Sequence, residues 1–223
     1  MVMQLNQFYV AELFGAYDAN SMNTAVPLRH NMDLSKPIPA SLLFATTYKQ
    51  AKATGYLSRA GYDKALSSIV TAHGGLVLQV SPDKVVALFA NRDLTQQNAA
   101  HQAITAALSL VDQIAMTNEY RLAAGNPAIH LGIGISTGVV TLEQTSNGLQ
   151  ISNSAGNALL NLAQQISDLN QQTPFPAAFI SDETYHSLLS HNSWHVENLG
   201  QVWLPAHSEA QTIHAVMRHP QFQ

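Results

Sequence analysis

The segment HGGLVLQVSPDKVVALF, residues 73–89, predicts the end of a helix followed by a tight β-hairpin. Two apolar runs, Leu76–Val80 and Val85–Phe89, have the length and the Val/Leu content of strands. The four residues between them, Ser81-Pro82-Asp83-Lys84, suit a turn because proline presets the first central position and aspartate favours the second. The preceding Gly74-Gly75 pair is typical of a helix end. We expect this hairpin at the centre of a mostly antiparallel sheet.

The composition describes an ordinary globular chain with few charges. Of its 223 residues 46% are hydrophobic and 11% are charged, with a net charge of -4 and only ten Lys and Arg. Nucleic-acid binding is not expected, because such a surface lacks a positive field. The chain contains no cysteine, which excludes disulfides and thiolate metal sites. No apolar run approaches the ~20 residues of a membrane span, and no signal peptide is evident. We therefore expect a cytoplasmic domain, alone or as the soluble part of a larger or membrane-attached protein.

The N-terminal residues differ in composition from the rest. Apolar residues recur at helical spacing over residues 1–20, which predicts a helix. This helix either packs on its own domain or acts as a coupling or dimerising helix. Residues 18–39 are rich in Asn, Ser, Met and Pro, as linkers are. The predicted division is an N-terminal helix and linker, 1–38, and one globular domain, 39–218.

Apolar periodicity divides the rest of the globular domain into strands and helices. The further strands are expected at Ala40–Ala45, Ile129–Leu142, Pro174–Ile180, Val196–Leu204 and Thr212–Met217. The helices are expected at 58–73, Gln96–Tyr120, Ile151–Leu169, starting with Gly156-Asn157, and Thr184–Ser190 with Ser181 as N-cap. Glu143–Gln150 is expected to be a polar turn. The order β-α-β-β-α-β with C-terminal αβ additions predicts an α+β, ferredoxin-like core, whose first two helices cover one face.

Several segments resemble the class III adenylate and guanylate cyclase catalytic domain. Its central hairpin also follows Gly-Gly, turns at Gly-Asp and ends in Ala-(Leu or Val)-Phe. Its first strand resembles Leu42–Ala45, and its strand Gly-Ile-(His or Ser)-Thr-Gly-x-Val resembles Gly134–Val140. The resemblance spans about residues 40–217 and implies a cyclase-like fold. It also implies head-to-tail pairing, as a homodimer or as a heterodimer with a related domain.

The resemblance assigns two metal-binding positions to Thr46 and Asp83. In the family both are aspartates that hold two catalytic metal ions, and here the first has become threonine. The base-reading positions fall at Gln79, a lysine in the family, and at Ser154, or Asn153 if an extra residue is placed differently. These residues are substrate-binding candidates only through the resemblance.

Two further positions fall on the helix predicted over Ile151–Leu169. The ribose-binding asparagine matches Asn161, and the arginine that stabilises the transition state matches Gln165. The family's phosphate-binding glycine after the first strand is also missing. Asp83 and Asn161 each have a structural alternative, as a turn residue and as a helix-packing residue.

The missing charges predict a degenerate, catalytically silent cyclase-like domain that serves dimerisation or regulation in intracellular signalling, without a cofactor. The enzyme alternative is a divergent adenylate or guanylate cyclase, or a half-competent subunit, that uses Mg²⁺ or Mn²⁺ and a nucleoside triphosphate. A third possibility is a scaffold without a nucleotide pocket. His186, His191 and His195 lack carboxylate or cysteine partners in the sequence and are expected to be ordinary surface residues.

Overall fold

The computed structural model describes residues 36–47, 59–81, 83–90, 98–146, 148–173, 177–188, 194–205 and 207–219. All of them belong to one compact unit, Asp33–Gln223. The helix predicted over residues 1–20 and most of the predicted linker lie outside the described residues. The division of the chain at residues 38 and 39 therefore stays a prediction.

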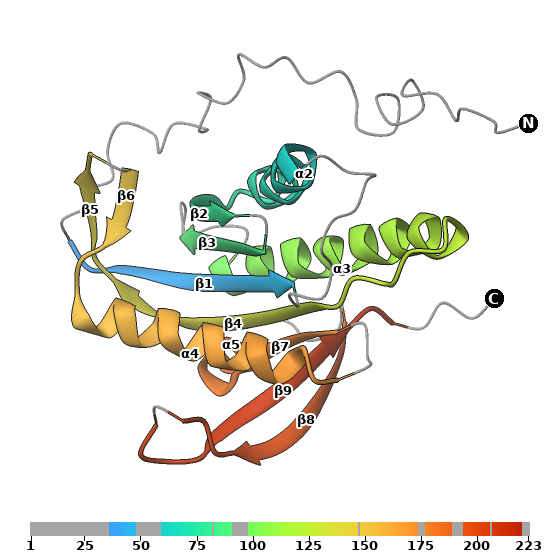
Figure 1. Ribbon diagram of the computed structural model, residues 1–223. Helices are drawn as coiled ribbons and strands as arrows, with labels where there is room; N and C mark the ends of the chain where they lie inside the picture. Colours follow the sequence, from blue (N-terminus) through green and yellow to red (C-terminus); the bar gives the residue numbers. More distant parts are fainter. Residues whose placement is uncertain are drawn as a thin grey trace, which may run out of the picture. The chain divides into compact units, whose positions relative to one another are not determined.

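Figure 1 shows a large sheet with helices on both faces and a small separate hairpin. The strands of the large sheet are β1 (Ile38–Thr47), β2 (Leu76–Ser81), β3 (Lys84–Ala90), β4 (Leu131–Val140), β7 (Ala178–Ser181), β8 (His195–Val202) and β9 (Gln211–Met217). The small hairpin consists of β5 (Leu142–Thr145) and β6 (Gly148–Ile151). The helices are α2 (Arg59–Ala72), α3 (Ala99–Ala123), α4 (Ser154–Asn170) and α5 (Asp182–His186).

The large sheet has the order β2-β3-β1-β4-β7-β9-β8. Its first four strands pair antiparallel and are connected as β-α-β-β-α-β, which is the predicted ferredoxin-like arrangement. Strand β7 pairs parallel with β4, and β9 and β8 continue antiparallel. The α+β fold class predicted from element order is confirmed.

The predicted position of the hairpin within the sheet is wrong. The β2–β3 hairpin lies at one end of the sheet, with β2 as the edge strand, and β1 and β4 occupy the interior. The reason is that β1 inserts between β3 and β4. The burial pattern agrees, since most of β3 is buried whereas β2 is half-buried or exposed throughout.

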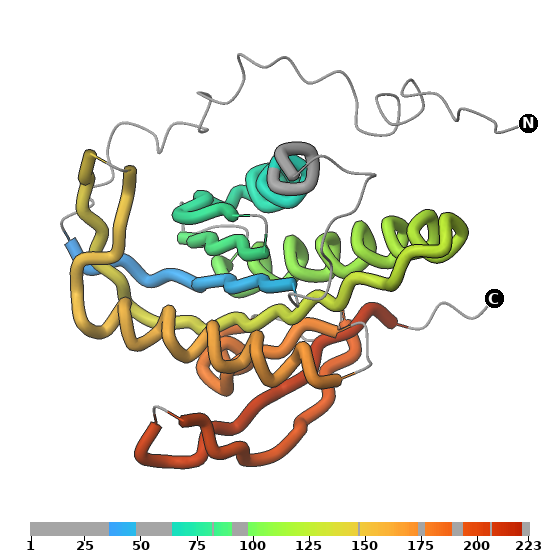
Figure 2. Tube along the Cα trace, viewed as in Figure 1, coloured from blue at the N-terminus to red at the C-terminus, as the bar shows by residue number. Residues whose placement is uncertain are grey.

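Alternation along the strands directs side chains to two separately covered faces. On one face, Leu43, Val85 and Ile135 belong to the main core beneath α2 and α3. This confirms that the two helices cover one face, and Figure 2 shows α4 along the other. There Phe44 and Val86 pack with Ala163 of α4. We call this second side the α4 face.

Three local expectations need correction. The segment predicted as a polar turn, Glu143–Gln150, contributes to the β5–β6 hairpin. Helix α4 starts at Ser154, before the predicted Gly156-Asn157, because the Asn153 side chain accepts a hydrogen bond from the Gly156 N–H and caps it. Ser181 caps α5 as predicted, but this helix covers only Asp182–His186. Of the helices that the structure describes, none is long and apolar enough to cross a membrane.

Candidate functional site

The end of β1 meets the β2–β3 turn. Thr46 lies opposite Lys84 in the register of β1 and β3. The Thr46 hydroxyl donates a hydrogen bond to the backbone oxygen of Asp83 at 3.0 Å, and the Thr47 N–H donates to the same oxygen at 2.9 Å. The two positions assigned to metal binding, Thr46 and Asp83, are therefore adjacent in space.

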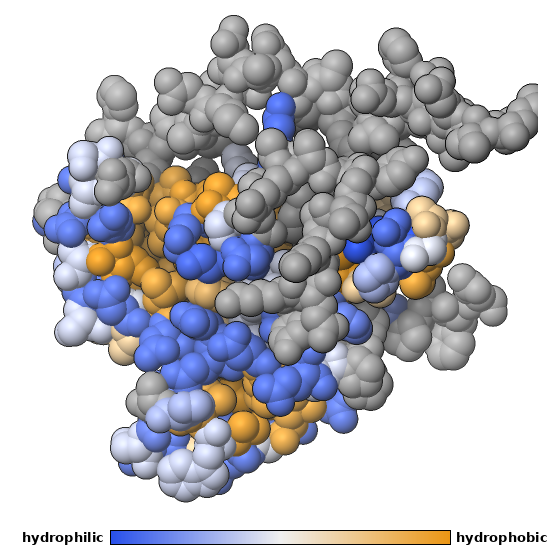
Figure 3. Space-filling model, viewed as in Figure 1, coloured by the Kyte–Doolittle hydropathy of each residue, from blue (hydrophilic) through white to orange (hydrophobic). Residues whose placement is uncertain are grey.

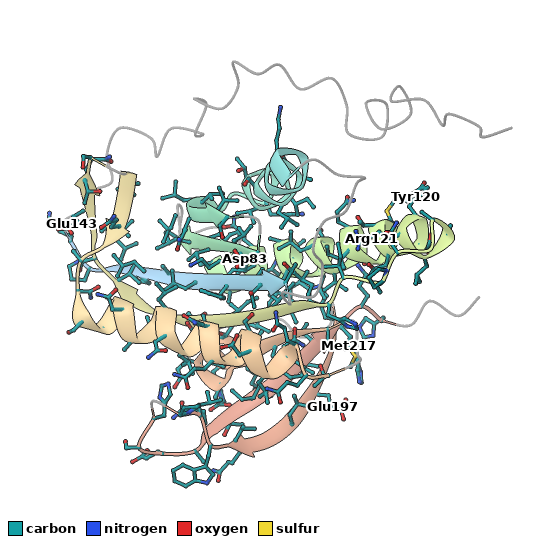
Figure 4. All side chains as sticks on the ribbon, viewed as in Figure 1. Asp83, Tyr120, Arg121, Glu143, Glu197 and Met217 are labelled. Carbon is teal, nitrogen blue, oxygen red and sulfur yellow. The ribbon has the colours of Figure 1, made fainter. Side chains whose placement is uncertain are left out.

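The carboxylate at this site belongs to Asp83, on the exposed turn labelled in Figure 4. The Ser81 hydroxyl donates a 2.7 Å hydrogen bond to Asp83 Oδ1, so this carboxylate has a partner within the turn. A two-metal site requires several charged oxygen ligands, and Thr46 supplies an uncharged hydroxyl. Among the described residues there is also no group of three His, Asp or Glu side chains that could hold a metal ion. The residues present do not fit a two-metal centre.

The two assigned positions on α4 also form a pair. Gln165 Nε2 donates a 3.0 Å hydrogen bond to Asn161 Oδ1, one helical turn away. Both side chains lie on the side of α4 opposite its buried stripe, which includes Leu162 and Ile166. An amide at Gln165 offers hydrogen bonds but no positive charge, so it cannot replace a guanidinium electrostatically.

The C-terminal end of α4 is connected to the end of β1. Gln171, just past the end of α4, donates a 2.9 Å hydrogen bond from Nε2 to the backbone oxygen of Thr46. Gln165 precedes Gln171 by six residues, which is about 9 Å along a helix axis. Asn161 precedes Gln171 by ten residues, which is about 15 Å. Asn161 and Gln165 therefore lie farther along α4 from the Thr46 contact than Gln171 does.

The base-reading candidates occupy three different environments. Gln79 is exposed on β2, opposite Val86, beside a register shift between Val77 and Gln79. Ser154 is the exposed first residue of α4. Asn153 is engaged in capping, because its Oδ1 also accepts a hydrogen bond from the Thr141 N–H at 3.0 Å. Asn153 is thus explained by local structure, and Ser154 and Gln79 stay candidates.

Glycines determine how closely α4 approaches β4. A Cβ atom added at Gly134 would overlap the backbone oxygen of Ala163, and one at Gly132 would overlap that of Ser167. At Gly138 the neighbour is the Leu159 side chain. The glycines of β4 therefore allow α4 to pack with its backbone against the strand, which sets the height of Asn161 and Gln165 above the sheet.

A polar cluster under α5 was not anticipated from the sequence. His214, buried on β9, places Nε2 2.9 Å from Asp182 Oδ1, and its ring stacks on Tyr185 at 4.2 Å. The buried Thr184 hydroxyl accepts a hydrogen bond from Thr137 Oγ1 at 3.0 Å. In the sequence, the apolar neighbours of His214 in TIHAVM gave no indication of this role. The available signal was Asp182, an aspartate directly after a strand.

The histidines singled out in the sequence are dispersed. His186 is exposed, with Nδ1 3.5 Å from Asp182 Oδ2, and His195 is exposed on β8. His191 lies outside the described residues. His73 is half-buried beside Ser109, 3.0 Å from Nε2 to Oγ, and burial together with the Arg218 guanidinium lowers the pKa of this imidazole.

This architecture is that of class III adenylate and guanylate cyclase catalytic domains, as comparison with solved structures shows. The adenylyl cyclase CyaB from P. aeruginosa superposes with a TM-score of 0.65 at 18% identity, covering 83% of this chain and 97% of that one. The guanylate cyclase domain of RhGC from Catenaria anguillulae, solved with GTP, gives 0.63 at 13% identity, covering 82% and 99%.

An adenylate/guanylate cyclase/hydrolase from Silicibacter pomeroyi gives a TM-score of 0.61 at 18% identity, covering 82% of this chain and 98% of that one. No family model and no curated protein sequence matches the chain. The likeness therefore lies in the fold, at identities below 20% in these three structures.

Proposed function

We propose that this chain is a catalytically silent domain of the class III nucleotidyl cyclase fold that acts as a dimerisation or regulatory module in signalling. The observation that carries the proposal is the bond between Thr46 and Asp83. At the position where the resemblance implies a metal-binding carboxylate, a neutral hydroxyl donates a hydrogen bond to the backbone oxygen of Asp83. It does not present a charged oxygen to a metal ion.

The chemistry of cyclisation explains why this exchange matters. Attack of a 3′-hydroxyl on an α-phosphate develops negative charge, which metal ions and a cationic side chain must stabilise. Asp83 alone supplies one carboxylate, and Mg²⁺ gives up its water reluctantly. Replacing the cation with Gln165 adds a second loss, and a phosphate-stabilising arginine is worth about 10³–10⁵ in rate in other phosphoryl-transfer enzymes. Both losses favour silence over slow turnover.

The dimeric part of the proposal has support from the α4 face. Leu78 and Leu160 are only partly buried against Phe44 and Val86 there. Apolar side chains that are only partly buried gain further burial if a second domain covers them. In a head-to-tail dimer, Asn161 and Gln165 of one copy would face Thr46 and Asp83 of the other.

A divergent active cyclase is the second candidate, because Asp83 and Asn161 are retained at their assigned positions. The relevant assay incubates the purified full chain with ATP or GTP and Mg²⁺ or Mn²⁺ and measures cyclic nucleotide. We expect no product. Turnover that disappears in Asp83→Ala would overturn the proposal and establish the enzyme. A Thr46→Asp/Gln165→Arg double variant serves as the matched gain-of-function test, and weak activity in it alone would support the proposal.

A further inference from the structure

The part of the α4 face formed by β1 to β4 and α4 carries very few charges. Across β1, β2, β3 and β4 the one charged side chain is Lys84, and along α4 it is Asp168. The other side chains on the outer side of α4 include the neutral amides of Asn161, Gln164 and Gln165. Figure 3 views this face and shows hydrophilic surface along α4, bordered above and below by apolar surface. Such a surface loses little hydration energy when it is covered, since ions are costly to desolvate.

Lys84 belongs to this face and not to the opposite one. It pairs with Thr46, two residues beyond the pair of Phe44 and Val86, so alternation directs it to the same side. Its ammonium lies 6.0 Å from the centre of the Phe44 ring. Lys84 is half-buried and forms no ion pair with any carboxylate in the described part of the chain.

Asp168 is the counterpart of opposite sign. It follows Gln165 by three residues and Asn161 by seven, so it continues their exposed stripe along α4. Among the described residues it has neither an ion-pair nor a hydrogen-bond partner. Within the described part of the chain, Lys84 and Asp168 are thus a cation and an anion on this face that have no ion-pair partner.

We propose that Lys84 of one copy pairs with Asp168 of a second copy, and that this reciprocal contact sets the register of a homodimer formed through the α4 face. In a two-fold dimer the same patch occurs on both partners, so a contact between residue 84 and residue 168 occurs twice. Each copy then supplies an opposite charge to Lys84 and to Asp168 of the other copy. This inference rests on the dimerisation proposed above and adds the contact that selects a second copy of this chain.

Charge reversal tests the contact on the full-length chain. Lys84→Glu and Asp168→Lys each place like charges at both symmetric contacts, so we expect the dimer dissociation constant to rise roughly 10- to 100-fold. In an equimolar mixture of these two variants, both contacts of the mixed dimer join opposite charges. We therefore expect heterodimers in the mixture, with an affinity within about threefold of wild type. Sedimentation measures the affinities, and native mass spectrometry with one isotope-labelled variant counts the mixed dimers.

Glu119→Lys, an exposed reversal on α3, is the matched control and should leave dimerisation unchanged. The Lys84→Glu/Asp168→Lys double variant should regain dimerisation, which also excludes misfolding of the single variants. A wild-type dimer that tolerates both single reversals, or a mixture without preferred heterodimers, overturns the Lys84–Asp168 pairing and leaves the dimer proposal intact. A wild-type monomer at tens of micromolar overturns both.

Discussion

The Thr46 hydroxyl donates a 3.0 Å hydrogen bond to the backbone carbonyl of Asp83, joining the end of β1 to the β2–β3 turn. A second bond, from the Thr47 N–H, reaches the same oxygen at 2.9 Å. The turn is therefore held by protein groups. Because the contact requires no metal ion, order at this turn should not depend on one.

This relationship predicts a gain of metal dependence in Thr46→Asp. The variant loses the hydroxyl donor and places a second carboxylate beside Asp83, so without metal it should be less stable than wild type by about 1 kcal/mol or more. Mn²⁺ at about 100 times its dissociation constant should then stabilise the variant by about 2.7 kcal/mol. Thermal unfolding with and without Mn²⁺ measures both effects. Thr46→Asn is the uncharged control, and an equal stabilisation of wild type by Mn²⁺ would contradict the prediction.

The close approach of α4 to β4 predicts different costs for two glycine substitutions. In Gly134→Ala the new methyl group would overlap the Ala163 backbone oxygen, so α4 would have to move. We expect a loss of about 3 kcal/mol or more. In Gly138→Ala the nearest atom is Leu159 Cδ1 at 2.5 Å, and this side chain can rotate, which should limit the loss to about 1 kcal/mol. Urea unfolding measures the loss of unfolding free energy in both variants. Equal losses would argue against backbone contact as the cause.

The buried Thr184 hydroxyl should contribute more to the free energy of unfolding than the Thr184 methyl group does. Thr184 Oγ1 lies 3.0 Å from Thr137 Oγ1 and 3.0 Å from Ser181 Oγ, in the core between α5 and the sheet. Thr184→Val removes both contacts, although Thr137 Oγ1 keeps Ser41 Oγ at 2.7 Å and Ser181 Oγ keeps the Thr184 N–H, and should cost about 1–3 kcal/mol of unfolding free energy. Thr184→Ser keeps the hydroxyl and should cost less. A Ser variant that is the less stable of the two would refute the role of the hydroxyl.

The imidazoles of His73 and His101 predict a loss of stability in acid. Burial lowers the pKa of both below the ordinary value near 6.5, and Arg218 lowers that of His73 further. The folded state therefore disfavours the protonated forms. Their contribution to stability is fully present above pH 6.5 and is lost as the pH falls through the lowered pKa values. A His73→Gln/His101→Gln variant, followed by urea unfolding from pH 7.5 to pH 5, should show a shallower decline than wild type.

Local patterns were sufficient for most elements of the fold. The 3.6-residue apolar stripe of α3 and the alternation of β4 indicate which side of each element is buried, because apolar residues recur on the buried side. The turn after Ser81 and the N-cap at Ser181 follow from side-chain chemistry within a few residues. The β5–β6 hairpin was missed because its strands have four residues each and contain polar side chains.

The residue types at the candidate site were also readable from the sequence. That Thr46 carries no carboxylate and Gln165 no guanidinium is a matter of composition at positions that a resemblance singled out. The absence of charge limits the chemistry whatever the neighbouring geometry is. The proposal of catalytic silence therefore starts from residue types, and the tertiary structure adds that the Thr46 hydroxyl is bonded to the Asp83 backbone.

The tertiary structure alone decided which distant residues meet. Gln171 reaches Thr46 across 125 positions, and His214 reaches Asp182 across 32. The insertion of β1 between β3 and β4 moved the hairpin from the predicted centre of the sheet to its edge. Strand order and the facing of α4 depend on how whole elements pack, and a local pattern specifies only that an element is buried, not what buries it.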